Sequence, residues 1–523
     1  MDTGPARASR LFALGGAALF AALAMWAAWR LSPTIDERDH IAFGREVLAG
    51  TCRQASMQKM AVTALNAAPQ AAADSLGIRL SPREALFVAR LPTILAAVLL
   101  LLLVRAVAAR RYGRAAGDFA LFLAVFCPTT LAHGSLATND LFAAASMFGA
   151  VLAFETWLRR RTWQWWAASA FAAALALLSK QTALLLPAAC LVMVALVRRA
   201  GPAPDRAFPA RAARAVLGTT LYVAVVLLAV NAAYAFRGSF HTVAEYRGFV
   251  NGLEESRVYT TLADHAGALP VPLPKAFAEG IAAGALMNKW GTGHPPVYLL
   301  GELNQKGFRH YYAVAAALKW PLPFLLVLVA SLLALLPRAA RSRWRRETVL
   351  LLPPLLVFVF LSFTTAQIGV RYLLPMLPFL HVFCGGALAR AFARGRTLRA
   401  GILLLGVWQV VSVLSYHPHQ IAYFNEIVPD RRLSWRYLAD SNLDWGQNRR
   451  DLEEYLSANR GRPIHFRPPQ PVSGTVLVDA NSLTGTTCPP EVYAWLRRGP
   501  PPVRHVAYSW LVFEVPPGDP ADR

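Results

Sequence analysis

Charged residues are scarce in this chain of 523 residues. Only 16% of the residues are Asp, Glu, Lys or Arg, whereas 55% are hydrophobic, and the mean hydropathy is +0.37. A soluble domain carries charge at about a quarter of its positions. The apolar residues also come in long uninterrupted blocks, and a helix needs ~20 of them to cross the hydrocarbon of a bilayer. The shortage of charge excludes a soluble globular protein and predicts an all-α polytopic membrane protein.

Cysteine is also rare, and its spacing does not indicate a zinc site. The five cysteines are Cys52, Cys127, Cys190, Cys384 and Cys488, and three of them lie inside apolar blocks. Cys52 and Cys488 fall in segments that we expect on the same side of the membrane. A disulfide between these two residues is one interpretation, and unpaired cysteines that serve packing are the other.

Negative charge is the scarcer sign, with 30 acidic against 53 basic residues and a net charge of +23. In a soluble protein this excess would indicate a nucleic-acid partner. Here the arginines cluster in short connections between apolar blocks, and the tail from His417 balances 12 Arg against 12 acidic residues. The excess charge is therefore a topology signal, and we expect no nucleic-acid partner.

About eleven apolar blocks predict transmembrane helices. If the N-terminus is cytoplasmic, the five arginine-rich connections after every second span all face the cytoplasm, as the positive-inside rule requires. The first span is long and lacks a small-residue cleavage site, so we expect it to be retained. The predicted spans lie near 11–31, 86–108, 117–134, 140–158, 163–179, 181–197, 214–236, 312–336, 347–366, 370–392 and 399–416.

This topology divides the chain into two predicted domains. Residues 1–416 form a transmembrane domain with two long outer loops, 32–85 and 237–311. Residues 417–523 contain proline-rich breaks and short β-like runs, which predict a small α/β domain on the outer face. Loops of this length are usually functional.

The first outer loop begins with two adjacent carboxylates, Asp36 and Glu37, and His40 follows them. Carboxylates at a membrane surface could position a hydroxyl or amine and accept its proton. The same pair could instead cap a helix, because acidic residues favour a first turn. Spacing alone leaves both interpretations open.

Further polar residues stand at the outer ends of predicted spans. An ionisable residue at membrane depth, such as Asp140, is a functional candidate by default. Arg371 has a guanidinium that would suit two phosphate oxygens. Lys180 could bind a phosphate as a point charge, with snorkelling as the alternative. In the tail, Trp445 could stack on a sugar ring, unless the string 440–447 is only a turn before a capped helix. The other site candidates are His133, His294, Glu302, Asn425, Glu426, Asp440, Asn442, Asp444 and Gln447.

Several strings in a fixed order resemble one family. They are Asp36-Glu37, Arg90-Leu91-Pro92, His133-Gly134, Thr138-Asn139-Asp140, Gly293-His294-Pro295, Lys319-Trp320-Pro321-Leu322-Pro323, Ile368-Gly369-Val370-Arg371-Tyr372, Tyr423-Phe424-Asn425-Glu426 and Asp440–Gln447. Together they resemble the bacterial membrane glycosyltransferases of the protein-mannosyltransferase type, a GT-C fold superfamily that uses polyprenyl-phosphate sugars and includes the lipid A aminoarabinose transferases. The resemblance covers nearly the whole chain.

The resemblance implies an inverting glycosyltransferase at the outer face of a bacterial inner membrane. Asp36, with Glu37 beside it, would act on a protein, lipid or glycan acceptor. By their chemistry we assign Arg371, Lys180 and Tyr372 to the phosphate of the donor. The chain lacks the His-Pro-Pro-Leu string with which many members continue the first loop, so the acceptor is not implied. No cofactor is assigned, but carboxylates with histidines could hold a divalent metal.

Two other classes of function fit a polytopic membrane protein. A transporter or flippase of a lipid-linked or polar solute would carry polar residues through the middle of several spans. A non-catalytic scaffold would only present the tail. Here the polar residues gather at the outer ends of spans, which favours chemistry on a lipid-borne donor.

Overall fold

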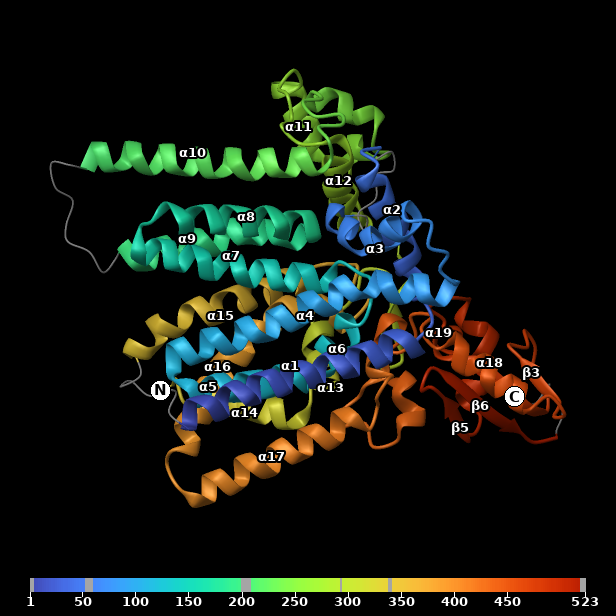
Figure 1. The fold of residues 1–523 in the computed structure, drawn as a ribbon. Helices are drawn as coiled ribbons and strands as arrows, with labels where there is room; N and C mark the ends of the chain where they lie inside the picture. Colours follow the sequence, from blue (N-terminus) through green and yellow to red (C-terminus); the bar gives the residue numbers. More distant parts are fainter. Residues whose placement is uncertain (1–3, 52–59, 199–207, 292–293, 337–340, 518–523) are drawn as a thin grey trace.

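The computed structural model describes residues 4–51, 60–198, 208–291, 294–336 and 341–517. Long helices lie side by side as an elongated array (Figure 1). The array consists of α1 (Gly4–Arg30), α4 (Pro82–Tyr112), α5 (Arg114–Val125), α7 (Asp140–Arg160), α8 (Trp163–Ser179), α9 (Leu186–Arg198), α10 (Phe208–Ala233), α14 (Leu322–Leu333), α15 (Arg341–Ser362), α16 (Leu377–Phe392) and α17 (Arg396–Leu414).

Six helices among the described residues are long and apolar enough to cross a membrane, so the chain is a multi-pass membrane protein. The number rises to eight if each of two bent pairs is one span. In one pair α5 meets α6 (Pro128–Gly134) at 64°, and in the other α13 (Tyr311–Lys319) meets α14 at 119°. A count of eleven is therefore not confirmed, although a helix coincides with each predicted block.

Among the described residues, three predicted spans do not form helices that are both long and apolar enough to cross a membrane, for reasons that differ between them. Helix α8 has 17 residues and α9 has 13, so each is shorter than a full span. Helix α15 has 22 residues but begins with arginines and contains Pro353 and Pro354. All three still pack within the array, since α8 lies against α7 and α15 lies against α16.

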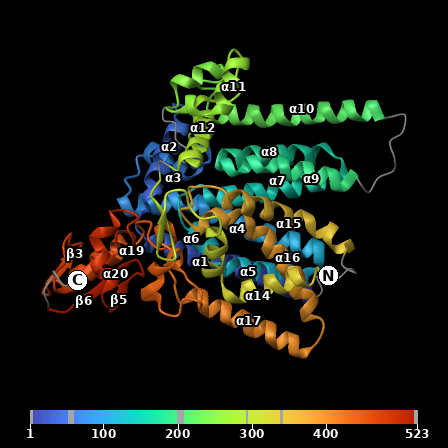
Figure 2. The same ribbon diagram turned by 180° about the vertical axis from the view of Figure 1, so that it is seen from behind.

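Short elements cover one end of the array, which we call the sheet end (Figures 1 and 2). The end of α1 leads there into α2 (Ile35–Leu48), and α3 (Ala64–Ser75) packs against α2. The second long loop supplies the remaining pieces, which are α11 (Arg257–Ala266), α12 (Lys275–Trp290) and a hairpin of β1 (Val297–Leu299) with β2 (Glu302–Asn304). We call the opposite end of the array the far end.

A four-stranded sheet in the order β3-β4-β6-β5 follows the last long helix. Its strands are β3 (Ile464–Phe466), β4 (Gly474–Asp479), β5 (Arg504–Val506) and β6 (Trp510–Val515). Strands β4 and β6 pair antiparallel over six residues, and Val476, Leu477 and Phe513 are buried. Helices α18 (Arg449–Ala458), α19 (Ala480–Thr484) and α20 (Ala494–Arg498) complete this part.

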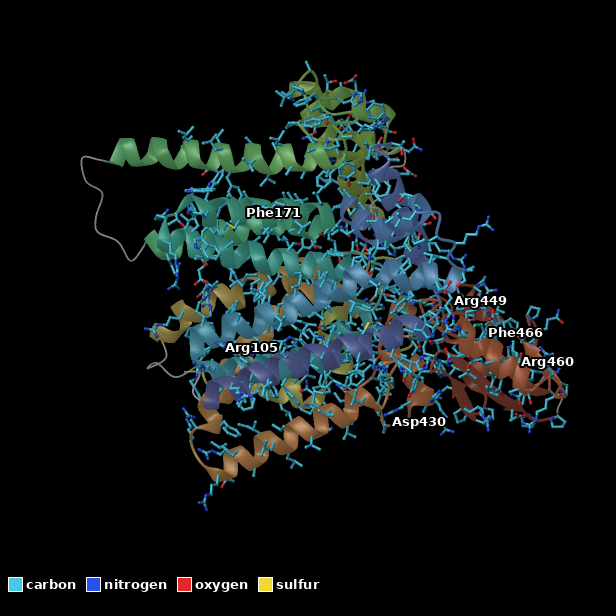
Figure 3. All side chains as sticks on the ribbon, in the orientation of Figure 1. Arg105, Phe171, Asp430, Arg449, Arg460 and Phe466 are labelled. Carbon is cyan, nitrogen blue, oxygen red and sulfur yellow. The ribbon has the colours of Figure 1, made fainter. Side chains whose placement is uncertain are left out.

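Side chains show the same division of the molecule (Figure 3). Arg449, Arg460 and Phe466 lie on the part that carries the sheet, whereas Arg105 lies within the helix array. The division of the chain into two domains at residue 416 stays a prediction. The predicted disulfide involves Cys52, which lies outside the described residues.

Candidate functional site

The first turn of α2 brings Asp36 against a residue 335 positions away in the chain. One guanidinium nitrogen of Arg371 donates to Asp36 Oδ2 at 3.2 Å and lies 3.7 Å from Asp140 Oδ2. Arg371 belongs to η6 (Val370–Met376), which precedes α16, and Asp140 begins α7. The side chain of Asp36 is 15% exposed, that of Arg371 7% and that of Asp140 1%. Asp36 is therefore the most accessible group of the three.

Lys180 joins the same site from the turn that follows α8. Its ammonium donates to Asp140 Oδ1 and lies 4.0 Å from the centre of the Tyr372 ring. The Lys180 side chain is 16% exposed, so it is the cation of the site that solvent reaches most easily. We call Asp36, Asp140, Lys180, Arg371 and Tyr372 the open cluster.

Aromatic rings hold the guanidinium of Arg371. Its carbon lies 4.0 Å from the centre of the Trp445 ring and 5.5 Å from that of Tyr372. The Trp445 ring also lies 6.0 Å from the ring of His133, and both residues are buried. A cation over an indole face is stabilised by about 0.5–2 kcal/mol. Trp445 therefore positions Arg371 rather than facing solvent.

Two further titratable residues face the open cluster. His40 is buried one turn after Asp36, and burial lowers its pKa although the charges of Asp36 and Asp140 act in the opposite direction. Burial raises the pKa of Asp440 to about 6, while a backbone N–H from Ser441 and the charge of Arg371 oppose that rise. Near neutral pH the His40 side chain is therefore neutral, whereas the Asp440 carboxyl becomes protonated only as the pH falls toward about 6.

Glu37 lies in a separate, fully buried group. Arg90 donates to both of its carboxylate oxygens, at 2.8 and 2.7 Å, and both side chains have 0% exposure. The backbone N–H groups of Thr34 and Ala137 donate to the same carboxylate. Burial alone would raise the pKa of Glu37, but the ion pair with Arg90 outweighs it and the pKa lies below its ordinary value. We call Glu37 and Arg90 the buried cluster.

The helix-capping interpretation is therefore confirmed for Glu37, whose carboxylate caps the N-terminal turn of α2. Arg90 also donates to one carbonyl oxygen in the last turn of α1 and to two that directly follow the helix, so it fixes the corner between α1 and α2. These acceptors are the carbonyl oxygens of Ala28, Leu31 and Ser32.

The tail string 440–447 connects the two halves of the open cluster. The N–H groups of Ser32 and Ile35 donate to the carbonyl oxygens of Gln447 and Trp445, both at 2.9 Å. At the other end of the string, the side-chain oxygen of Asn442 accepts the N–H of Val370 at 2.9 Å. The string therefore fixes the position of Asp36 relative to that of Arg371.

Close approach of the string to η6 requires glycine at position 369. Gly369 has φ +151, and a Cβ added there would lie 2.4 Å from Ser441 Oγ. The Ser441 hydroxyl instead donates to the carbonyl oxygen of Ile368. A side chain at this position would push the string away from Arg371.

Other tail candidates have structural partners. Asn425 donates to the carbonyl oxygens of Ala317 and Trp320 at 2.6 and 2.8 Å, which satisfies the break between α13 and α14. Asp444 accepts the N–H of Gly446 at 2.9 Å, and burial raises its pKa to about 7. Gln447 accepts the N–H of Trp445 within the string, at 2.6 Å.

Three predicted candidates are not brought to the open cluster by any contact among the described residues. Glu302 is exposed on the β1–β2 hairpin, and Glu426 is exposed after the first turn of the tail. His294 has Nδ1 2.7 Å from the carbonyl oxygen of its neighbour Pro295. Their assignment to the site stays a prediction.

Sequence reasoning placed Arg90 and Lys319 only within family strings and assigned them no role. Lys319 is buried, and its ammonium donates to the carbonyl oxygens of Ile421 and Asn442 at 2.8 and 2.6 Å. These two hydrogen bonds hold the tail string in place. Their positions in the sequence could have indicated a role for Arg90 and Lys319, because burying an arginine or a lysine inside an apolar block costs free energy unless the side chain has partners.

No group of three or more His, Cys, Asp or Glu side chains suited to a metal ion occurs in the described part of the chain. The possibility of a divalent metal therefore has no ligand set in these residues.

Residues 75–227 match the family described as dolichyl-phosphate-mannose-protein mannosyltransferase. No curated protein matches the chain at a significant level.

Among solved structures, the chain is similar to ArnT from Cupriavidus metallidurans, with 18% identity and a TM-score of 0.45. That match covers 78% of this chain but 65% of ArnT, so the chain spans less than two thirds of that protein. It is also similar to the archaeal oligosaccharyltransferase AglB from Archaeoglobus fulgidus, with 14% identity, a TM-score of 0.48, and coverage of 86% of this chain and 59% of that one.

The matched segment contains α4, the bent α5–α6 pair and α7, and with them Arg90, His133, Asp140 and Lys180. This match over residues 75–227 bears out the resemblance of the chain to the protein-mannosyltransferase family.

Proposed function

We propose that this protein is a membrane glycosyltransferase that moves a sugar from a polyprenyl-phosphate-linked donor to an acceptor. The observation that carries the proposal is the open cluster, where a partly exposed carboxylate lies 3.2 Å from a guanidinium and an accessible ammonium stands beside them. A base and two cations within one site are the groups that transfer from a lipid phosphate requires.

Asp36 is the proposed general base. Its carboxylate accepts the proton of the acceptor hydroxyl or amine as that atom forms a bond to the anomeric carbon. The bond between the anomeric carbon and the phosphate oxygen breaks, and its electron pair leaves with the polyprenyl phosphate. One displacement of this kind inverts the anomeric centre. Asp36 suits this role because it is more exposed than Glu37 and is held by a single hydrogen bond from Arg371.

Lys180 and Arg371 are the proposed partners of the leaving phosphate. Negative charge develops on that phosphate in the transition state, and fixed cations stabilise it without reorganising. Asp140 contacts both cations and is itself almost fully buried, so it holds them at the site. Tyr372 presents its ring face to Lys180 and keeps the ammonium close to Arg371.

The proposal includes an orientation. The open cluster, both long loops and the sheet lie at the sheet end, and the arginine-rich helix ends lie at the far end (Figure 1). By the positive-inside rule the far end faces the cytoplasm of a bacterial inner membrane, and transfer takes place at the outer face.

Donor turnover by the purified full-length protein tests the proposal. The probes are undecaprenyl-phosphate mannose, glucose and aminoarabinose, offered with an envelope fraction from cells that lack the protein, and the readout is released undecaprenyl phosphate. Asp36→Asn should lower turnover between about 10² and 10⁴-fold, because the proton acceptor is lost. Asp39→Asn is the matched control, since Asp39 lies on the same turn of α2 but is exposed.

Equal turnover by the two variants would contradict the assignment of Asp36. If the wild-type protein moves the intact donor across a vesicle membrane and releases no undecaprenyl phosphate, it is a flippase and the proposal is wrong. Mass spectrometry of envelope proteins, lipids and glycans from cells with and without the protein identifies the acceptor.

A further inference from the structure

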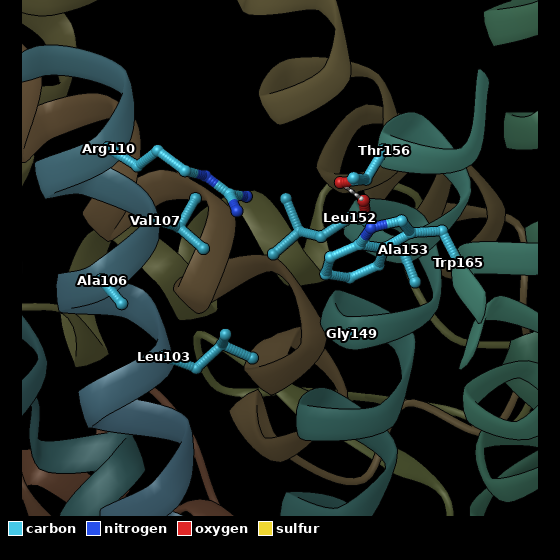
Figure 4. A pocket seen from close by; sticks show the side chains of 9 residues that line it. All are labelled: Leu103, Ala106, Val107, Arg110, Gly149, Leu152, Ala153, Thr156 and Trp165. Carbon is cyan, nitrogen blue, oxygen red and sulfur yellow. Dashed lines mark hydrogen bonds between the residues drawn. The ribbon is translucent and has the colours of Figure 1, made fainter. Parts of the chain in front are cut away.

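A cavity of about 240 Å³ opens between α4, α7 and α8, away from the open cluster (Figure 4). Its lining residues come from the second half of α4, the second half of α7 and the beginning of α8. These parts of the helices lie toward the far end, so the cavity and the open cluster lie toward opposite ends of the helix array (Figure 1). The lining residues are Leu103, Ala106, Val107, Arg110, Gly149, Leu152, Ala153, Thr156 and Trp165.

The two long walls of the cavity have the same helical pattern. On α4 the lining positions are 103, 106, 107 and 110, and on α7 they are 149, 152, 153 and 156. Each set follows the spacing i, i+3, i+4, i+7, which places its members on one face along about 10 Å of helix. The cavity is therefore a groove that runs along the helix axes, in the direction that a lipid chain takes.

Polarity changes along this groove. Its deeper part is made of Leu103, Ala106 and Leu152, whereas Arg110, Thr156 and Trp165 stand where the helices approach their charged ends. Figure 4 shows the Arg110 side chain reaching across toward α7 above the apolar side chains. Tryptophan and arginine at such a level are typical of the headgroup region of a bilayer.

Arg110 differs from its neighbours in charge balance. Glu155 forms ion pairs with both Arg111 and Arg159, and it accepts a hydrogen bond from Arg159 at 2.8 Å. Arg110 itself has no ion pair or hydrogen bond with another described residue. The groove therefore presents one uncompensated positive charge above an apolar channel.

We propose that this groove is a binding site for an anionic phospholipid, with one acyl chain between α4 and α7 and the phosphate on Arg110. The volume of the groove suits a single chain rather than a whole ligand of several hundred Å³. A basic pocket between transmembrane helices on the arginine-rich side is a recognised arrangement for acidic headgroups. The site lies toward the other end of the helix array from the open cluster and does not depend on the proposed transfer.

Native mass spectrometry of the full-length protein in detergent tests this site. The probes are phosphatidylglycerol and phosphatidylcholine with identical acyl chains, each titrated onto delipidated protein. We expect phosphatidylglycerol to bind more tightly, and Arg110→Gln to weaken its binding about fivefold, because one interfacial cation is lost. Arg114→Gln is the matched control, since it removes the same charge from an exposed position four residues away, outside the groove.

A second variant tests the apolar part without changing charge. Ala106→Phe should fill the groove and lower phosphatidylglycerol binding to the level of Arg110→Gln. The proposal is overturned if Arg110→Gln and Arg114→Gln bind phosphatidylglycerol alike, if phosphatidylcholine binds the wild-type protein as tightly, or if Ala106→Phe leaves binding unchanged. A folded, monodisperse preparation of each variant by size exclusion is required before the comparison.

Discussion

Asp36 and Glu37 are adjacent in sequence, but they belong to two regions with different properties. In the buried cluster Glu37 and Arg90 are both 0% exposed, and Glu37 accepts five hydrogen bonds from Arg90, Thr34 and Ala137. In the open cluster Asp36 is 15% exposed and accepts one hydrogen bond, from Arg371. The carboxylate of Glu37 therefore has all its hydrogen-bonding capacity taken by structural partners, whereas that of Asp36 can still accept a hydrogen bond from a ligand.

A helix explains how neighbours separate in this way. Successive side chains on an α-helix point about 100° apart, so the first turn of α2 directs Glu37 toward α4 and Asp36 toward η6. The ion pair of the buried cluster fixes the direction in which α2 leaves the membrane. The position of Asp36 therefore depends on Glu37, although Glu37 does not face the donor.

The largest effect should come from breaking the buried cluster. Glu37→Gln leaves the Arg90 guanidinium buried without its counter-charge, which costs about 3–5 kcal/mol. We expect a much lower melting temperature or no folded protein, measured by thermal unfolding in detergent. Glu37→Gln combined with Arg90→Met removes both charges and should recover most of the stability, because well-packed apolar replacements of a buried pair are often neutral.

Asp36→Asn provides the contrast, since it should leave the melting temperature near that of the wild-type protein while transfer is lost. If Glu37→Gln is as stable as the wild-type protein but inactive, Glu37 takes part in the chemistry, and the separation into two clusters is wrong.

Arg371→Lys should give the next largest effect. Lysine keeps the charge but lacks the flat guanidinium, so it cannot stack as well on Trp445 while it contacts Asp36 and Asp140. Loss of one charged hydrogen bond of about 1.5–3 kcal/mol corresponds to a fall in kcat/KM of roughly tenfold to a hundredfold. Arg309→Lys, at an exposed arginine, is the control and should have no such effect. Unchanged kcat/KM in Arg371→Lys would show that only a positive charge is needed there.

A smaller effect is expected from Trp445→Leu. The variant loses the cation–π contact with Arg371, worth about 0.5–2 kcal/mol, but keeps the backbone bond from Ile35 to residue 445. Donor turnover should therefore fall about tenfold with only a modest change in melting temperature. A large loss of stability with normal turnover per folded molecule would mean that Trp445 serves packing alone.

The sequence predicted the open cluster better than the buried one. Asp36, Asp140, Lys180 and Arg371 were expected on one side of the membrane, because topology places the outer ends of spans together, and the structure brings them into contact. The partner of Glu37 could not be inferred, since the choice between Arg90 and other cations depends on how α1, α2 and α4 pack.

The tail string shows the same limit. Its dense polar residues marked it as a candidate, but their roles as backbone hydrogen-bond partners follow from the tertiary fold. Asn442, for example, bonds to the N–H of Val370, 72 residues earlier in the chain. The span count was the weakest part, because α8, α9 and α15 are short or carry charge although their sequence blocks are apolar.

A pH-dependent effect is expected at Asp444, a buried carboxyl that accepts a hydrogen bond from a backbone N–H, whereas Glu37 accepts hydrogen bonds from a guanidinium. Burial raises the pKa of Asp444 from 3.8 to about 7. Between these two values the folded protein keeps a proton that the unfolded chain has released. Stability should therefore fall as the pH rises through this window, by up to about 1.4 kcal/mol per pH unit, and level off above it.

Asp444→Asn should remove this contribution, because asparagine is neutral at every pH and still offers an oxygen to Gly446. The melting temperature of the variant relative to the wild-type protein should then increase from pH 5 to pH 8. Glu426→Gln is the control, since Glu426 is exposed and its difference from the wild-type protein should stay constant. A constant difference for Asp444→Asn as well would mean that Asp444 is ionised throughout this range. Asp444 would then be charged like Glu37, although it has no guanidinium partner, and the contrast between these two buried residues would be wrong.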